Sequence, residues 1–307
     1  MRLLTLFLAL GLAARSAEAD DLIPVGQEHW QKPWMPDLRK AGARVELTDD
    51  KRVDVLILGD GYLAAERGDF EKDVQAWYAG FQKLTPWSRL RGAFRVRGLW
   101  TASEARATSE RKSWYQITST AADVGDVSGE GTRKAIFESI ERAGTNRAKA
   151  GIRLTHTVVV MLVKNERGRN PSGMSRRVLS PDDKLSVGTA FAAYTHHEFG
   201  HAFGGLKDEY IRGEGSVSKG KPPPRASFAA LSNLSFTKDP ALLPWAHLMP
   251  GTALNPDKAS MIGLLWLGGE QEQGAWHSEA RCLMNGTHEN WDLARTRRGV
   301  LLRDHAR

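Results

Sequence analysis

The residues with the clearest chemical potential lie between His197 and His201, where the sequence reads His-Glu-Phe-Gly-His. Residues four apart on a helix lie on one face about one turn apart, so the two imidazoles can hold one zinc ion. Glu198, beside the first imidazole, can then reach a water on that ion and act as general base. The pattern predicts a metal-dependent hydrolase. The alternative interpretation is a surface helix with two solvated histidines and an ordinary glutamate.

A catalytic zinc site needs a third protein ligand and one position open to water. The acidic pair Asp208 and Glu209 follows the motif closely and offers two carboxylates. Between them and the motif, Gly204 and Gly205 can end the helix, because glycine adopts the left-handed conformation past a helix C-terminus at little cost. Upstream, the apolar residues at 191–194 predict that the helix extends before the motif and is buried there.

The elements that must position the motif alternate between strands and helices. Hydrophobic periodicity predicts strands at 45–48, 53–58, 94–100 and 154–163, and helices at 62–84 and 132–148. Residues 20–41 read as an extended lead-in on the domain surface, and residues 164–185 read as a loop rich in Gly, Pro, Ser and Arg. We therefore expect an α/β fold with an upper lobe over about 42–205 and an irregular C-terminal lobe over about 206–307.

The N-terminal residues have the pattern of a targeting segment. Arg2 supplies a positive charge, an apolar run follows at 3–12, and Ala-Glu-Ala at 17–19 is a small-x-small cleavage site. The apolar run is too short to cross a bilayer, and no other stretch approaches about 20 apolar residues. We expect residues 1–19 to be a signal peptide and 20–307 to be one catalytic domain, exported to the periplasm or extracellular space without a membrane span. An uncleaved N-terminal anchor is the alternative.

Composition excludes several classes of protein. The net charge of +7, from 43 basic and 36 acidic residues, is mild and does not predict nucleic-acid binding, which needs a concentrated basic stripe. The single cysteine, Cys282, excludes an internal disulfide. The segment Gly59-Asp-Gly61 after a predicted strand mimics a dinucleotide-binding fingerprint, but no carboxylate follows about 20 positions later. A tight strand-to-helix turn is the preferred interpretation.

Three blocks, in order along the chain, resemble the IgA-peptidase family of metallopeptidases, a metzincin-like group. The first block runs from Val53 to Glu66, the second from His197 to Tyr210, and the third is Cys282-Leu-Met284. The middle block is the most distinctive of the three. The resemblance implies a metzincin-like metallopeptidase fold: a mixed twisted sheet, an active-site helix and an irregular C-terminal subdomain, with Zn²⁺ as cofactor.

The same resemblance implies roles for individual residues. His197 and His201 become zinc ligands, and Glu198 becomes the general base. Met284 becomes the methionine-turn residue, although its spacing alone is more typical of an ordinary core methionine. The Gly-Asp-Gly segment belongs to the family pattern, which removes the dinucleotide interpretation.

The chain departs from the metzincin pattern at the third ligand. Metzincins place that ligand six residues after the second histidine, where this chain has Lys207, a poor ligand while protonated. Asp208 is the nearest donor and is our predicted third ligand, with Glu209 as the alternate. Tyr210 and His277 are candidates for stabilising the oxyanion that forms during hydrolysis.

Together these features predict an exported zinc-dependent endopeptidase that hydrolyses a protein or peptide substrate. Two alternatives remain: a non-catalytic surface binding protein stapled by zinc, and a zinc amidase acting on a non-protein amide. The strand ending near Val163 is expected to pair with an extended peptide substrate. The basic residues of the 164–185 segment either favour acidic substrates or form a solvated loop.

Overall fold

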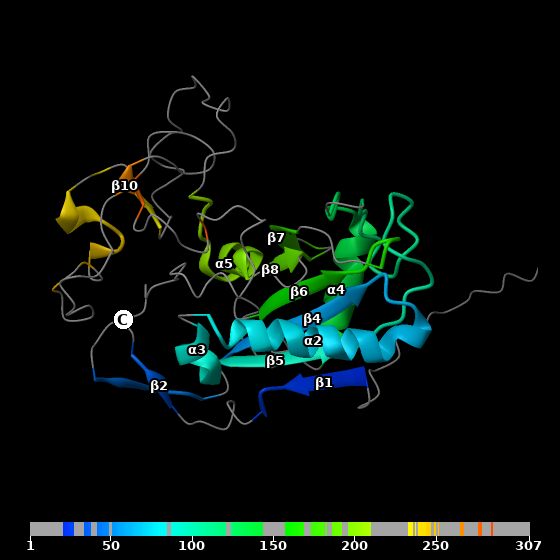
Figure 1. Cartoon of the computed structure of the whole chain (residues 1–307), viewed down its shortest axis with the longest axis horizontal. Helices are drawn as coiled ribbons and strands as arrows, with labels where there is room; N and C mark the ends of the chain where they lie inside the picture. The colour runs from blue at the N-terminus through cyan, green and yellow to red at the C-terminus, as the bar shows by residue number, and fades with distance from the viewer. Residues whose placement is uncertain are drawn as a thin grey trace, which may run out of the picture.

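The chain folds around a six-stranded mixed sheet, accompanied by a three-stranded and a two-stranded sheet (Figure 1). The computed structural model describes residues 21–27, 34–37, 42–48, 51–84, 87–120, 124–143, 157–168, 173–180, 182, 186–191, 196–209, 233–235, 237, 239–246, 249, 251, 265–266, 276–277 and 284. None of the helices in these residues is both long enough and apolar enough to cross a bilayer.

The main sheet has its two most apolar strands at its centre. Its order is β1-β5-β4-β6-β8-β7. The bounds are β1 Leu22–Val25, β4 Val53–Asp60, β5 Phe94–Leu99, β6 Thr157–Val163, β7 Met174–Leu179 and β8 Ser186–Phe191. The four inner strands run parallel, whereas β1 and β7 pair antiparallel at the edges. The strands predicted at 53–58, 94–100 and 154–163 are confirmed within the described residues.

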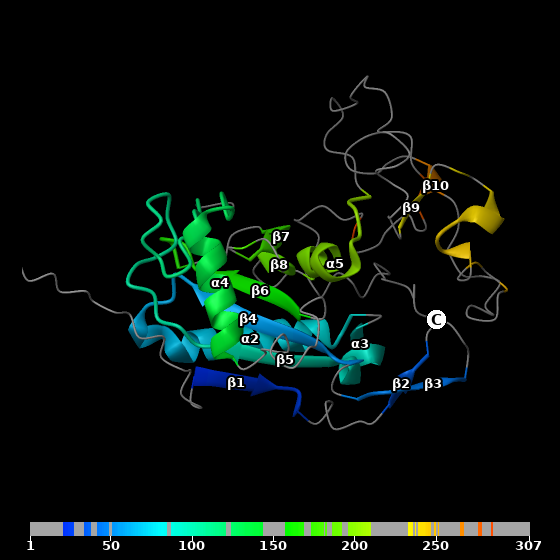
Figure 2. The ribbon, with the colours of Figure 1, turned by 180° about the vertical axis from the view of Figure 1, so that it is seen from behind.

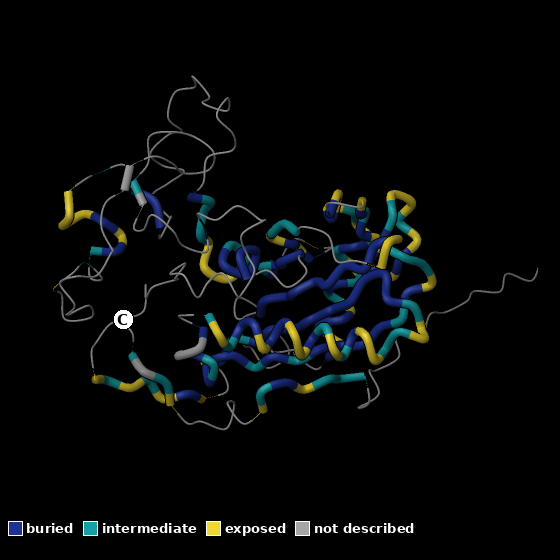
Figure 3. Tube along the Cα trace, viewed as in Figure 1, coloured by how far each residue is buried: buried dark blue, intermediate teal, exposed yellow. Residues whose placement is uncertain are grey.

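Helices cover both faces of this sheet. Helix α2 (Arg67–Phe81), preceded by the 3-10 turn η3 (Ala64–Glu66), lies on one face, and α4 (Glu130–Arg142) lies on the other (Figures 1 and 2). Side chains alternate along a strand, so Val55 and Ile57 join the core beneath α2 whereas Leu56 and Leu58 join the core beneath α4. Burial on both faces explains why residues 55–58 of β4 are a continuous apolar run (Figure 3).

The Gly-Asp-Gly segment forms the turn from β4 to α2. Gly61 has φ +77°, and a Cβ there would lie 2.2 Å from the Lys164 carbonyl oxygen, so only glycine fits without rearrangement. Asp60 is fully buried and accepts hydrogen bonds from Ser113 Oγ at 2.7 Å and Tyr115 N at 2.9 Å. Burial raises the pKa of Asp60, and the bonds to its carboxylate partly oppose that rise. The segment therefore anchors a long connection to the sheet, in agreement with the turn interpretation.

Two predictions for the segment before the motif helix are wrong. Residues 174–179, expected to be loop, form the antiparallel edge strand β7 beside β8. Phe191, expected in the motif helix, is the last residue of β8. Arg176 and Arg177 are exposed on β7, so its composition resembles a loop, while pairing with β8 gives it strand structure.

Two further expectations are corrected by the pairing of strands. Strand β6 pairs with β4 on one side and β8 on the other, so the strand ending at Val163 has no free edge for a peptide. The lead-in at 20–41 does not merely lie on the surface, because β1 pairs with β5 as part of the main sheet. Near the same end of the chain, β2 (Trp34–Pro36) pairs with β3 (Arg44–Glu46).

The remaining elements flank the main sheet. Between α2 and β5 lie the short helix α3 (Trp87–Leu90) and the 3-10 turn η4 (Arg91–Ala93). The C-terminal region contributes β9 (Leu234–Ser235), the 3-10 turn η6 (Pro240–Leu242), β10 (Leu265–Trp266) and β11 (Trp276–His277). Strands β10, β11 and β9 form the three-stranded sheet in that order. This sheet lies beyond the motif helix α5 (His197–Gly204), on the side away from α4 (Figures 1 and 2).

Candidate metal centre

The motif helix α5 is held on the sheet by its apolar face. Phe199 is fully buried, and its ring lies 5.2 Å from Phe81, 5.3 Å from Trp87 and 5.8 Å from Trp77, measured between centroids. Such edge-to-face contacts favour one orientation of the ring in addition to burying apolar area. Because Phe199 lies between the two motif histidines in sequence, its packing turns His197 and His201 away from the aromatic cluster.

Glycines mark the end of this helix and the point where it lies closest to the sheet. The helix ends at Gly204, and Gly205 follows with φ +61°, donating to the carbonyls of Gly200 and His201. The prediction that these glycines end the helix is confirmed. On strand β8, a Cβ at Gly188 would lie 2.3 Å from the carbonyl oxygen of Ala202, so the helix backbone lies directly against the strand.

A third histidine, His196, anchors the start of the helix. Its Nε2 donates to the Trp77 carbonyl oxygen at 3.1 Å, and its ring lies 5.0 Å from the Trp77 ring. Burial lowers the pKa of His196 to about 4, so the imidazole is neutral at neutral pH. This residue therefore fixes the first motif histidine relative to α2. No sequence signal points to that role, because a histidine beside the motif looks like a further metal ligand.

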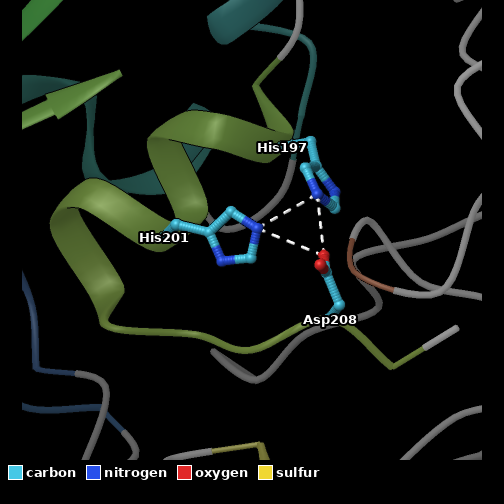
Figure 4. A group of neighbouring side chains, drawn as sticks. All are labelled: His197, His201 and Asp208. Carbon is cyan, nitrogen blue, oxygen red and sulfur yellow. Dashed lines mark hydrogen bonds and ion pairs between the residues drawn. The ribbon is translucent and has the colours of Figure 1, made fainter. Parts of the chain in front are cut away.

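His197, His201 and Asp208 bring one donor atom each to a common point (Figure 4). The two Nε2 atoms are 3.1 Å apart, and Asp208 Oδ1 lies 3.0 Å from that of His197 and 3.2 Å from that of His201. The two imidazoles come from α5, and the carboxylate comes from the segment that follows it. The structure thus brings together three of the residues that the sequence proposes as metal ligands.

The protonation of His201 follows from its second nitrogen. Nδ1 lies 2.6 Å from the Leu206 carbonyl oxygen, which can only accept, so Nδ1 must bear the proton. In the neutral imidazole this leaves the lone pair of Nε2 facing His197 and Asp208. A backbone carbonyl in this position is a common way of orienting a metal-binding histidine.

The electrostatics of the three donors favour a cation between them. Asp208 Oδ1 is buried, and its close contacts with the imidazoles lack hydrogen-bond geometry, with no other partner among the described residues. Burial alone would raise the pKa of Asp208, but His197 and His201 together hold it well below its usual range. Burial alone would lower the pKa of His201, but Asp208, the Leu206 carbonyl and the charge of Glu198 raise it. Three acceptor atoms at this spacing are satisfied by protons or by a metal ion.

The sequence was also compared with known proteins. It matches the family model described as IgA Peptidase M64 over residues 44–259, which is more than half of the chain. The chain belongs to this family. A search of curated proteins finds no match. The match spans the main sheet from β4 onward, helix α5 and all three residues of the donor cluster, so the chain is a peptidase from a metallopeptidase family and its substrate is a protein or peptide.

Glu198 of this M64 peptidase lies in the first turn of α5, directly after His197, and is 4% exposed. Its charge is one of the causes that raise the pKa of His201. A helix N-terminus also stabilises a carboxylate in the first turn. The residue predicted as general base is thus buried beside the predicted metal ligands.

The alternate ligand, Glu209, is placed differently from Asp208. Glu209 is 2% exposed, and its Oε1 accepts a hydrogen bond from Asn233 Nδ2 at 3.0 Å. Its backbone N donates to the Met284 carbonyl oxygen at 2.7 Å. The cluster of possible ligands contains Asp208 and does not contain Glu209. Met284 is buried, and its carbonyl oxygen binds the segment that bears Asp208.

The two oxyanion candidates are less fully placed in this M64 peptidase. Tyr210 lies outside the described residues. The backbone of His277 lies in β11 opposite Leu234 of β9, and its side chain lies outside the described part of the structure. Leu234 directly follows Asn233, so the backbone of His277 runs in the strand next to the residue that holds Glu209. The sequence carries no signal for a role of Asn233 at this site, and its side chain is 1% exposed in the folded chain.

Proposed function

We propose that the chain is an exported zinc-dependent endopeptidase with His197, His201 and Asp208 as metal ligands and Glu198 as general base. The observation that supports this most is the convergence of two Nε2 atoms and one carboxylate oxygen within 3.0–3.2 Å of one another, beside a buried glutamate. Family membership establishes the peptidase, and the donor cluster supplies the reason for choosing a metal mechanism.

The donor set fits zinc. Zinc binds histidine nitrogen and carboxylate oxygen, and catalytic zinc sites typically have three protein ligands. Ligand atoms at tetrahedral angles and about 2.0–2.1 Å from one ion lie roughly 3.3 Å apart. The three observed separations, 3.0–3.2 Å, are close to that value. A calcium or magnesium site would instead be built from oxygen donors, because these hard cations prefer carboxylates, carbonyls and water.

When bound, zinc lowers the pKa of a water towards about 7 and polarises the scissile carbonyl. The protein residues supply the proton transfers. Glu198 takes the proton from the attacking water and delivers it to the departing amine nitrogen, so the peptide bond and water become a carboxylic acid and an amine. Because Glu198 is buried, the effective dielectric constant around it is lower than in water, and its electrostatic interactions with charged groups are stronger. Tyr210 and His277 remain our candidates for donors to the oxyanion.

We further propose that the fold is metzincin-like in its irregular C-terminal part. The support is the hydrogen bond from Glu209 N to the carbonyl of buried Met284, which joins a C-terminal turn to the ligand segment. Replacing Met284 by Leu, which conserves apolar volume, should cost little stability, on the order of 1 kcal/mol. If the metal site depends on this turn, Met284→Leu should also bind zinc more weakly than wild type. Unchanged zinc affinity in the folded variant would contradict the proposed methionine turn.

Export is supported only by the sequence of residues 1–19, with its positive start, apolar run and Ala-Glu-Ala site. The proposal predicts a mature N-terminus near Asp20 in the periplasmic or extracellular fraction. Edman or mass-spectrometric sequencing of the N-terminus from that fraction tests it. An intact Met1 on protein recovered from the membrane fraction would instead indicate an uncleaved anchor.

The central experiment compares the wild-type chain with Glu198→Ala and with Glu71→Ala, a helical glutamate whose side chain is 43% exposed and paired with Arg67. Each protein is measured for zinc content, for thermal unfolding and for hydrolysis of casein and of a peptide library, with and without chelator. We expect all three to bind zinc at one equivalent. Glu198→Ala should lose hydrolysis by roughly 10³-fold or more, because it removes a group that acts in the transition state.

The outcomes separate the alternatives. Zinc binding without any hydrolysis would favour a zinc-stapled binding protein. Hydrolysis of non-protein amides without cleavage of casein or peptides would favour an amidase. A fully active Glu198→Ala protein would refute the proposed base.

A further inference from the structure

The third donor of the cluster is not held by a helix or strand. Asp208 lies in the segment Leu206–Glu209, which follows Gly205 and has no regular secondary structure. The two imidazoles are fixed by α5, but the carboxylate depends on whatever fixes this segment. A site held to within about 0.5 Å needs supporting contacts around its ligands.

One side chain, Asn233, binds the residues on both sides of Asp208. Its Oδ1 accepts from Lys207 N at 3.0 Å, and its Nδ2 donates to the Lys207 carbonyl oxygen at 2.7 Å. The same Nδ2 donates to Glu209 Oε1 at 3.0 Å. Asn233 is 1% exposed, so water cannot easily replace these bonds.

We call the hydrogen bonds from the Asn233 side chain to Lys207 and Glu209 the bracket. These bonds require an amide. A carboxamide has one acceptor oxygen and two N–H donors in one plane, and here both donors and the acceptor are used. A carboxylate of the same shape has no donor, and it would face both the Lys207 carbonyl and the Glu209 carboxylate. A hydroxyl has a single donor and is too short to reach both neighbours.

Two other contacts complete the support of the segment. The His201 Nδ1–H donates to the Leu206 carbonyl oxygen, and Glu209 N donates to the Met284 carbonyl oxygen. Each residue around Asp208 is therefore bonded to another part of the chain, and the Asp208 side chain faces the imidazoles. The bracketing residue directly precedes strand β9, which pairs with β11.

We propose that Asn233 is a positioning residue for the metal centre: its amide brackets Lys207 and Glu209 so that the Asp208 carboxylate is presented to the ion in advance. The inference rests on the proposed role of Asp208 as third ligand. It makes the affinity for zinc depend on a residue 25 positions after Asp208 that does not touch the ion. It also explains why Glu209 lies outside the cluster, since Glu209 is the acceptor that completes the bracket.

The test measures zinc affinity of the full mature chain by chelator competition in wild type, Asn233→Asp, Asn233→Ser and the matched control Asn165→Ser. Asn165 is another fully buried asparagine, bonded to the Thr120 carbonyl and to Arg167 N, just after the end of β6. We expect both Asn233 variants to bind zinc roughly 10- to 100-fold more weakly, as is typical when an outer partner of a metal ligand is removed. Asn165→Ser should lower the unfolding temperature without changing zinc affinity.

A merely structural role is separated by thermal unfolding of the metal-free proteins and by activity at saturating zinc. Positioning predicts that hydrolysis by the Asn233 variants recovers substantially as zinc is raised, while Asn165→Ser shows no such zinc dependence. Folded Asn233 variants with wild-type zinc affinity would overturn the inference. Asp208→Ala separates this failure from that of the proposed function: if Asp208→Ala binds zinc as tightly as wild type, the ligand assignment itself is wrong.

A second measurement needs no variant and so does not depend on folding of a mutant. In the metal-free wild-type chain, the Lys207 amide should exchange with solvent slowly, because it is bonded to Asn233 before any ion arrives. Exchange at the rate of an unprotected amide would show that the bracket does not form in advance, and the inference would fall.

Discussion

The substitution Gly188→Ala tests how closely helix α5, which carries His197 and His201, lies against strand β8. The new Cβ would lie 2.3 Å from the carbonyl oxygen of Ala202 and 3.1 Å from its carbonyl carbon. Both are backbone atoms, so no side-chain rotation relieves the contact. Non-bonded heavy atoms prefer separations of roughly 3.5 Å, so α5 and β8 must separate by about 1 Å.

The expected magnitude follows from that displacement. Overpacking of this kind costs about 1–3 kcal/mol of unfolding free energy. The shift carries His197 and His201 together, because both belong to α5, but it does not carry Asp208, which the following segment holds. The Nε2 atoms of His197 and His201 therefore move away from the Asp208 carboxylate. Misplacement of catalytic groups by about 1 Å costs on the order of 10²-fold in rate, so we expect a loss of that size in kcat/KM.

The assay compares urea unfolding, zinc affinity and kcat/KM for wild type, Gly188→Ala and the control Gly68→Ala. Gly68 is exposed in the first turn of α2, and a Cβ there would meet no atom within 4 Å, so alanine should stabilise the helix slightly, by less than the roughly 0.5–1 kcal/mol typical of a helix interior. The two substitutions thus have opposite expected signs. Gly188→Ala with wild-type stability and wild-type zinc affinity would refute the argument that β8 sets the position of α5.

Two further predictions address the third ligand and the acid stability of the fold. Asp208→Ala should lower the zinc content of the purified protein more than Glu209→Ala does, measured by metal analysis after dialysis; the reverse order would transfer the ligand role to Glu209. Hydrogen bonds from Arg106, chiefly, lower the pKa of Glu66 to about 2, below its unfolded value of about 4.3. Glu66 therefore contributes stability above about pH 4.3 that is lost as the pH falls through 2. In urea unfolding at pH 7, the free energy of unfolding of wild type should exceed that of Glu66→Gln by about 1–3 kcal/mol. The same difference at pH 2 as at pH 7 would contradict the lowered pKa of Glu66.

Much of the central fold is predictable because its signals are local. Residues 55–58 of β4 and 158–163 of β6 are continuous apolar runs, which is the signature of a strand covered on both faces. Helix α2 places Phe70, Val74 and Trp77 on one side at helical spacing, and these residues are buried in the core. In each case the chain's own pattern of polarity indicates which face is covered.

The edge of the sheet beside α5 is not predictable in this way. Strand β7 exposes Arg176 and Arg177, and β8 has Gly188 where the helix backbone approaches. Neither sequence has the apolar or alternating pattern of a strand, because β7 is an edge strand and part of β8 is covered by backbone atoms. What makes them strands is their pairing with each other and with β6, which is tertiary information.

The same division runs through the candidate metal centre. His197, Glu198 and His201 could be read from the sequence because helical spacing alone places them together. Asp208 could be proposed only as the nearest donor, because its position depends on contacts far along the chain. The bracket from Asn233 is one such contact. It joins Asn233 to Lys207 and Glu209, which lie 26 and 24 positions earlier, and no sequence motif predicts it.

Two parts of the fold therefore position the candidate metal ligands, and a substitution can disturb either one without the other. The helix supplies two imidazoles and a glutamate at fixed spacing, and His196 fixes its start against α2 through the Trp77 carbonyl. Asn233, directly before strand β9 of the C-terminal sheet, fixes the segment that carries the carboxylate. Damage to the first should remove both affinity and chemistry, whereas damage to the second should weaken affinity while leaving the chemistry recoverable with excess zinc. The recovery of hydrolysis with added zinc therefore distinguishes the contribution of the helix from that of Asn233.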